Sequence, residues 1–365
     1  LTRRLRPVGR GRATYTPPML YLSTTEGVVR VNGETGAVTR LGPEGTSTES
    51  LAVAGDVIVA AVTPDYGLPM RNPLRPVDHP GAVRSENGGQ DWAPLETGLA
   101  GEQVTALAAL VAGGAERAGS TAGAFIAGTD PAELLVSQDA GDSWARGQSL
   151  REMPGYADWS YPLPPHTPHI MVIVPHPTQA DTVYAGVEVG GIVRTDDGGA
   201  TWRTTGEGCH PDIHGIAVCP AAPDVVYAST PQGVYVSEDG GERFSQRIDG
   251  LDPLYCRPIA VDPADPDVAV VVATNGASGF FGIAAERTGG ALFRTADRGA
   301  TWQQVTAGLP QPLAPTPTLV VDGGQTPARF YLPLFSGEVY VSDDGGASWR
   351  PLVGGLPPIL RATVA

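Results

Sequence analysis

One eight-residue phrase, which we call the box, occurs six times in this chain and constrains its fold more than any other feature. Its approximate pattern is S/T-x-D/N-x-G-x-S/T-W/F, and successive copies begin 42 to 58 residues apart. That spacing is the length of four short strands and their connections, which is one blade of a β-propeller. The copies are SENGGQDW from Ser85, SQDAGDSW from Ser137, TDDGGATW from Thr195, SEDGGERF from Ser237, TADRGATW from Thr295 and SDDGGASW from Ser342. The repeat therefore predicts a ring of four-stranded blades.

Each box is expected to close a hairpin. In GIVRTDDGGATWRTT an alternating strand ends at Arg194, a glycine-rich turn follows, and the next strand begins at Trp202. The aspartate can accept hydrogen bonds from turn amides, glycine allows a positive φ, and the aromatic ring can pack between neighbouring sheets. We interpret the box carboxylates as structural and not catalytic, namely Asp139, Asp197, Asp239, Asp297 and Asp344.

A second recurring phrase precedes each box, with an apolar strand, a Pro/Asp-rich turn and another strand, as in IMVIVPHPTQADTVYAG. These strands are predicted to be A and B of each blade, with the box between C and D. The whole blades are expected near residues 47–97, 102–148, 168–205, 213–248, 257–306 and 317–352. The N-terminal MLYLSTTEGVVRVNGETGAVTRL supplies B, C and D with a degenerate box, and LRATVA supplies strand A. Joined, they complete a seven-bladed, all-β propeller over residues 19–365 without free sheet edges.

Charge and composition exclude some partners. Residues 1–18 contain five arginines and no acidic residue, and we interpret them as a disordered or non-native upstream extension. The remaining residues hold 19 arginines against 39 acidic residues, a net charge of −20 that would repel phosphates and anionic membranes. No apolar stretch approaches the roughly 20 residues of a membrane span, and no secretory signal is visible. We expect no nucleic acid or membrane partner and a cytoplasmic location.

The boxes and the A–B phrases resemble the Asp-box (BNR) propeller superfamily. This superfamily includes sialidases, xyloglucanase-type glycoside hydrolases, the sortilin ectodomain and a photosystem II assembly factor, so the resemblance implies the fold and leaves activity open. Sialidases carry an FRIP-like arginine motif near the first blade, and the nearest string here, CRPIAV from Cys256, lies in the sixth. Sialidase activity is therefore not expected. Xyloglucanases usually pair two propellers around a cleft, and this chain contains one.

Long insertions are expected mainly in the D–A and B–C connections, which share one face of a propeller. They are Thr63–Arg84, Ala145–His169 and Asn275–Gly290, and only the insertion Val111–Ala122 is expected on the opposite face. Loops of this length in a compact domain are often functional. Aromatic residues in them suit sugar stacking or a small organic ligand, although loops packing on one another is the alternative. With Arg361 of the closing strand, the predicted ligand-binding residues are Trp159, Tyr161, Phe280, Phe281 and Arg361.

Five of the six histidines fall within 49 residues of two adjacent blades. His166 and His169 precede strand A of the fourth blade, and His210 and His214 precede or open that of the fifth, so all four are expected on one face near the channel. Glu188 ends strand B of the fourth blade on the same side. Histidines with a carboxylate can bind Zn, Mn or Fe, and the predicted metal ligands are His166, His169, His210, His214 and Glu188.

Tyr255 and Arg257 open the sixth blade beside these histidines. Tyrosine or histidine next to arginine can abstract a proton and neutralise the resulting charge, a combination that is similar in residue types to polysaccharide lyases on seven-bladed propellers. The candidate catalytic residues are His210, His214, Glu188, Tyr255 and Arg257. The alternative is that the imidazoles hydrogen-bond loop carbonyls and fill the funnel.

Three functions remain open from the sequence. The first is binding of a carbohydrate-like or small organic ligand at this face, with or without its turnover by hydrolysis or elimination and with or without a divalent metal. The second is a non-catalytic scaffold that holds a protein partner with its aromatic loops. The third is a glycoside hydrolase of the xyloglucanase type.

Overall fold

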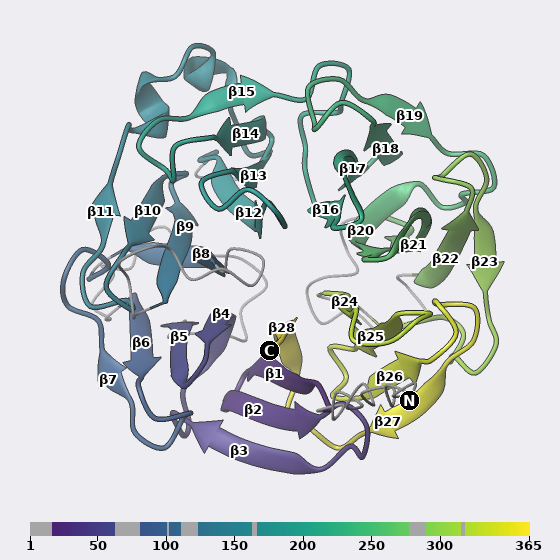
Figure 1. Ribbon diagram of the computed structural model, residues 1–365, viewed down its shortest axis with the longest axis horizontal. Helices are drawn as coiled ribbons and strands as arrows, with labels where there is room; N and C mark the ends of the chain where they lie inside the picture. Colours follow the sequence, from purple (N-terminus) through teal and green to yellow (C-terminus); the bar gives the residue numbers. More distant parts are fainter. Residues whose placement is uncertain are drawn as a thin grey trace, which may run out of the picture.

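The computed structural model describes residues 17–62, 81–100, 102–110, 123–162, 166–276, 289–314 and 318–365. Their strands form seven sheets of four antiparallel strands each, arranged in a ring around a central space (Figure 1). The predicted all-β, seven-bladed propeller is confirmed. Within these ranges no helix is long and apolar enough to cross a membrane.

The strands follow the predicted order A, B, C, D in every blade, with A innermost. Blade 1 comprises β28 (Ile359–Val364), β1 (Met19–Thr24), β2 (Gly27–Asn32) and β3 (Val38–Gly42). Blade 2 comprises β4 (Thr48–Ala54), β5 (Val57–Val62), β6 (Ala82–Ser85) and β7 (Ala93–Pro94). Blade 3 comprises β8 (Gln103–Leu110), β9 (Ala124–Asp130), β10 (Leu134–Ser137) and β11 (Ala145–Arg146).

Blades 4 to 7 repeat this arrangement. Blade 4 comprises β12 (His169–Pro175), β13 (Val183–Glu188), β14 (Gly191–Thr195) and β15 (Arg203–Thr205). Blade 5 comprises β16 (Gly215–Cys219), β17 (Ala222–Thr230), β18 (Gly233–Ser237) and β19 (Ser245–Arg247). Blade 6 comprises β20 (Tyr255–Asp262), β21 (Asp265–Thr274), β22 (Ala291–Ala296) and β23 (Gln303–Val305). Blade 7 comprises β24 (Val320–Asp322), β25 (Arg329–Pro333), β26 (Val339–Ser342) and β27 (Arg350–Val353).

Because neighbouring strands are antiparallel, the connections sort onto two faces. We call the face where each strand A begins and each strand B ends the entry face, and the opposite one the box face. The long D–A connection before β12 carries two short 3-10 turns, η1 (Leu150–Glu152) and η2 (Tyr156–Asp158). The predicted insertions Thr63–Arg84 and Asn275–Gly290 fall between strands B and C, but residues 63–80 and 277–288, with Phe280 and Phe281, lie outside the described residues.

Blade 1 closes the ring as predicted, with three strands from the N-terminal part of the chain and one from the C-terminal part. Strand β28 pairs with β1 in the register Leu20↔Val364. Met19 and Ala365 exchange both of their backbone hydrogen bonds, at 3.2 and 3.0 Å. This pairing leaves no open blade edge between the first and last strands of the propeller.

The boxes form the C–D turns through one recurring hydrogen-bond network. In blade 4 the Asp197 carboxylate accepts hydrogen bonds from the Thr195 hydroxyl at 2.7 Å and from the Thr201 amide at 2.9 Å. Its second oxygen accepts the Thr201 hydroxyl at 2.6 Å. These bonds, with those from Thr201 foremost, lower the pKa of Asp197 to about 2. The carboxylate is thus used within its own turn, as the structural interpretation requires.

The box aromatics fill the spaces between blades. Trp302 of blade 6 is 3% exposed and packs in the same apolar cluster as Tyr227 and Val234 of blade 5. Its Nε1 donates to the carbonyl of Arg247, also in blade 5, at 3.1 Å. Trp144, Phe244 and Trp349 likewise pack against the preceding blade. Burial of these rings holds the ring of blades together.

Buried thiols take no part in disulfides in this fold. Cys209, Cys219 and Cys256 are all free, and burial raises the pKa of Cys209 and of Cys256 to about 12. A thiol with so high a pKa is a poor nucleophile at neutral pH.

Candidate functional site

Six polar side chains of blades 4, 5 and 6 converge on the entry face beside the central space. We call this group the entry-face cluster; its members are His169, Glu188, Asp212, His214, Tyr255 and Arg257. All six lie at the beginning of a strand A, at the end of a strand B or in the loop before a strand A. Four of them are buried and two are half-buried, so the group lies in the wall of the channel.

His169 and Glu188 form the blade 4 part of the cluster. They begin β12 and end β13, and they are directly opposite each other in the strand register. His169 Nε2 lies 2.7 Å from Glu188 Oε2, and each side chain is only 8% exposed. Burial by itself would raise the pKa of Glu188, but the hydrogen bond from His169 and the charges around it outweigh burial and lower that pKa to about 2. Glu188 is therefore a fixed carboxylate at neutral pH.

The turn after Glu188 is tied to the loop of blade 5. The amides of Gly190 and Gly191 both donate to the carbonyl of Pro211, at 3.1 and 2.7 Å. A Cβ on Gly190 would meet Val187 at 2.5 Å and the Trp159 ring at 2.9 Å, so this turn accepts little but glycine. These two hydrogen bonds place the end of β13 beside Asp212.

His214 and Asp212 form the blade 5 part. His214 Nδ1 lies 2.7 Å from the carbonyl oxygen of Cys256 in blade 6. Its Nε2 lies 3.3 Å from Asp212 Oδ1, but the two atoms do not form a hydrogen bond, and both are buried without a hydrogen-bond partner. Three of the eight such side-chain atoms among the described residues belong to the cluster, the third being His169 Nδ1. Orphaned buried atoms of this kind call for a physical explanation.

Tyr255 and Arg257 complete the cluster from blade 6. The rings of Tyr255 and His214 have centroids 4.8 Å apart, and the Arg257 guanidinium carbon lies 5.7 Å from the Tyr255 ring centroid. Burial raises the pKa of Tyr255, and the positive charge of Arg257 offsets this only in part. Tyr255 therefore remains a phenol at neutral pH and can donate its proton in a hydrogen bond.

The cluster offers fixed charges and donors close together. One ligand atom each from Glu188, Asp212 and His214 lies within 4.8 Å of the others. At neutral pH Glu188 is ionised and Tyr255 is protonated. The pKa of Glu188 is lowered and that of Tyr255 is raised, so neither group is tuned for proton exchange at that pH. Such a group can hold a cation, orient a hydroxyl or neutralise an anionic group.

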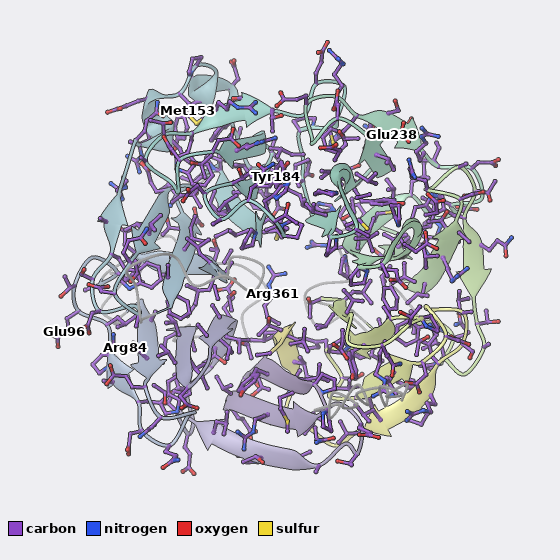
Figure 2. All side chains as sticks on the ribbon, viewed as in Figure 1. Arg84, Glu96, Met153, Tyr184, Glu238 and Arg361 are labelled. Atoms are coloured by element: carbon purple, nitrogen blue, oxygen red, sulfur yellow. The ribbon has the colours of Figure 1, made fainter. Side chains whose placement is uncertain are left out.

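The predicted rim residues serve partly in packing. Trp159 and Tyr156 have ring centroids 5.1 Å apart and pack against the apolar core of blades 3 and 4. The Tyr161 ring meets the His169 ring edge-on at 5.2 Å, which places Tyr161 directly beside the cluster. Figure 2 shows Arg361 of β28 in the central space, and its Nη2 donates to the Met171 carbonyl of β12 at 3.1 Å. Blades 1 and 4 are thus joined across the channel.

The structure brings two of the four predicted histidines into the cluster. His166 is exposed, with a positive φ of 65°, and its Nδ1 lies 2.9 Å from the Tyr161 carbonyl. His210 Nδ1 accepts the Asp212 amide at 3.1 Å, so it shapes the loop that carries Asp212. Among the described residues, neither ring forms a hydrogen bond or ion pair with Glu188.

Asp212 is the member that the sequence analysis missed. It stands between the two histidines in HPDIH, immediately before strand A of blade 5. An acidic residue between two histidines in an entry-face loop was the available signal. Glu188, which lies near Asp212 in the cluster, belongs to another blade, so the distance between them in the sequence does not predict that they are close in space.

A hollow lies at the perimeter, between the outer strand β23 of blade 6 and the box of blade 7. It measures about 390 Å³ and is lined by residues that include Asp297, Thr301, Gln303 and Ala347. The Asp297 carboxylate is already used by the amide and hydroxyl of Thr301 in its own box. The carboxylate of this groove is therefore occupied by its own turn.

Comparison with known proteins shows the fold and no family. No protein-family profile and no curated protein matches the sequence. By structure the chain is similar to the GH74 xyloglucanase of Xanthomonas campestris, with a TM-score of 0.65 and 17% identity over 93% of this chain and 53% of that one. A GH74 enzyme of Niastella koreensis gives a TM-score of 0.62 and 18% identity over 93% and 52%. The chain thus spans about half the length of these enzymes.

Two other similar structures match over most of their own length. YCF48 bound to a D1 peptide gives a TM-score of 0.54 and 14% identity over 93% of this chain and 85% of that one. A protein from Lactobacillus plantarum gives 0.59 and 13% over 96% and 99%. At these identities the similarity shows a shared propeller fold, found in glycoside hydrolases and in a peptide-bound protein alike.

Proposed function

We propose that the protein binds a small, hydroxyl-rich or anionic ligand, carbohydrate-like in its chemistry, at the entry face of blades 4 to 6. The observation that carries this proposal is the entry-face cluster, in which polar groups of three blades meet at the channel wall with buried atoms left unpaired. Unpaired buried polar atoms are costly in a structural role, and a ligand would satisfy them. The similarity to GH74 xyloglucanases supports a carbohydrate ligand at the level of fold.

The half-buried groups at the cluster supply the contact surface in this proposal. Tyr255 presents a phenol, Arg361 presents a guanidinium in the channel, and the Tyr161 ring lies beside His169. Aromatic rings with a few convergent polar groups are the usual composition of a sugar or small-ligand site. Because Glu188 and Tyr255 are not tuned for proton exchange at neutral pH, binding is favoured over acid–base catalysis.

This proposal can be tested by screening a library of glycans and small molecules by thermal shift and then measuring the affinity of each hit by calorimetry. Tyr255→Phe removes one hydroxyl and should weaken binding of the best ligand about 10-fold, since a hydrogen bond in a desolvated site contributes about 1.5 kcal/mol. Tyr340→Phe, at a half-buried phenol of blade 7, is the matched control and should leave affinity unchanged. Equal affinity of Tyr255→Phe, Arg361→Gln and wild type for every ligand found would refute the entry-face location.

The second candidate function is a peptide-binding scaffold. It is favoured by the similarity to peptide-bound YCF48, which covers 85% of that chain and therefore matches a whole single propeller. Against it, Val38 and Leu254 are the large exposed hydrophobic residues among those described, and neither is aromatic. Binding of a peptide library with no response to glycans, and without an effect of Tyr255→Phe, would favour the scaffold.

A further inference from the structure

His214 is held in one tautomer by blade 6. A carbonyl oxygen can only accept a hydrogen bond, so the 2.7 Å contact with the Cys256 carbonyl requires a proton on His214 Nδ1. In a neutral imidazole the lone pair is then on Nε2. The His214 side chain is 0% exposed, and this Nε2 has no hydrogen-bond partner. A histidine whose Nδ1–H is bonded to a backbone carbonyl presents Nε2 in the manner of a metal ligand.

The atom facing that lone pair is also electron-rich. Asp212 Oδ1 lies 3.3 Å from His214 Nε2 and likewise lacks a hydrogen-bond partner. Glu188 supplies a third ligand atom, and all three atoms lie within 4.8 Å of one another. Two facing acceptors without a hydrogen-bond donor, Asp212 Oδ1 and a His214 Nε2 that carries a lone pair, repel each other unless a cation lies between them.

The distances suit a transition-metal ion. Ligand atoms around a tetrahedral zinc ion lie about 3.3 Å apart, since each is about 2 Å from the metal. The separation of 3.3 Å between His214 Nε2 and Asp212 Oδ1 already meets this condition. Glu188 places its ligand atom within 4.8 Å of the other two, and its 2.7 Å bond from His169 Nε2 orients the carboxylate as second-layer histidines and carboxylates do in metal sites.

We propose that Glu188, Asp212 and His214 bind one divalent transition-metal ion, with His169 as a positioning residue for Glu188. One imidazole nitrogen and two carboxylates are donors that suit Zn²⁺ or Mn²⁺. Three protein ligands leave a fourth coordination position for a water molecule or a ligand atom. The inference rests on the proposed ligand site, because the ion would form its floor. The ion with Arg257 would give the site a net positive charge, which makes the preferred ligand an anionic one.

The test is calorimetric titration of chelator-treated protein with ZnCl₂ and with MnCl₂ alone, checked by metal analysis after gel filtration. Wild type should retain one ion per chain. Asp212→Asn and His214→Gln should weaken binding at least 100-fold, and His169→Gln about 10- to 100-fold. His166→Asn removes an exposed histidine of the same face and should bind as wild type does. Circular dichroism and melting temperature establish that each variant is folded.

Several outcomes would overturn the metal site. They are a folded wild type that binds neither ion, binding that is unchanged in folded Asp212→Asn, and loss of binding in His166→Asn alone. In any of these cases the contact between His214 and Asp212 is an ion pair with a proton on Nε2. The proposed function fails separately, because ligand affinity that depends on Tyr255 can persist without metal, and metal can bind where no ligand does.

Discussion

The boxes and the entry-face cluster use the same kinds of side chain and treat their polar atoms in opposite ways. In the box of blade 4, both oxygens of Asp197 accept hydrogen bonds from residues of the same turn. In the cluster, Asp212 Oδ1 and His214 Nε2 face each other without forming a hydrogen bond. The box carboxylate has all of its hydrogen bonds within the fold, whereas the cluster carboxylate has a buried oxygen that accepts none.

The two regions also differ in the source of their partners. A box aspartate is satisfied by groups two to four residues away, so the turn is complete before neighbouring blades pack. Cluster contacts join different blades, as in the bond from His214 of blade 5 to the Cys256 carbonyl of blade 6. The hydrogen bonds within a box stabilise its own hairpin. The contacts of the cluster form only when the blades have packed into the closed ring. Mutations in the two regions should therefore have different readouts.

The largest expected effect on stability is at a box aromatic. Trp302→Ala removes a ring that is 3% exposed and packs between blades 5 and 6, which should lower the free energy of unfolding by about 3–5 kcal/mol. Tyr255→Phe keeps its ring in the cluster and should change that free energy by less than about 1 kcal/mol. Urea denaturation followed by tryptophan fluorescence and circular dichroism measures both. Similar losses in the two variants would break the distinction between the regions.

A pair of aspartate substitutions gives the sharpest contrast. Asp197→Ala deprives three donors of their acceptor in the box of blade 4 and should cost about 1–2 kcal/mol of stability. Asp212→Asn should be neutral or stabilising by up to about 1 kcal/mol in metal-free protein, because the new amide can donate to His214 Nε2. Melting temperatures in the presence of a chelator test this pair. A destabilised Asp212→Asn would show that the carboxylate already has a structural role.

The fold was predictable from the sequence because the box is a local device. Its glycines, hydroxyls and aspartate lie within eight residues, and its period follows the blades, so the seven-bladed count and the closure of blade 1 are confirmed. The cluster was predictable only in part. His169 and Glu188 are partners in strand register, which the strand order implies, whereas Asp212 reaches them through the backbone tie between Gly191 and Pro211 of neighbouring blades. Contacts of that kind have no signature in residue spacing.

The box carboxylates should contribute to the acid sensitivity of the fold. The folded-state pKa of Asp197, about 2, lies below its ordinary value of 3.8. The unfolded chain therefore binds more protons in this range, so the contribution of Asp197 is complete above about pH 4 and is lost as the pH falls through 2. Asp197→Asn should flatten the decline in the urea midpoint between pH 5 and pH 2.5. An unchanged slope would show that exposure to solvent screens this carboxylate almost completely.

The smallest expected effect is at the degenerate box of blade 1, where Asn32 at the end of β2 is the side chain that caps the turn. Asn32 Oδ1 accepts the amides of Glu34 and Thr35 at 3.0 and 2.8 Å, and no box tryptophan follows. A neutral amide with two exposed donors should contribute about 0.5–1 kcal/mol, so Asn32→Ala should cost less than Asp197→Ala in the same urea series. A larger cost would mean that blade 1, which joins β28 to β1, depends on its turn more than on strand pairing. The box would then act in ring closure as well as in the local hairpin.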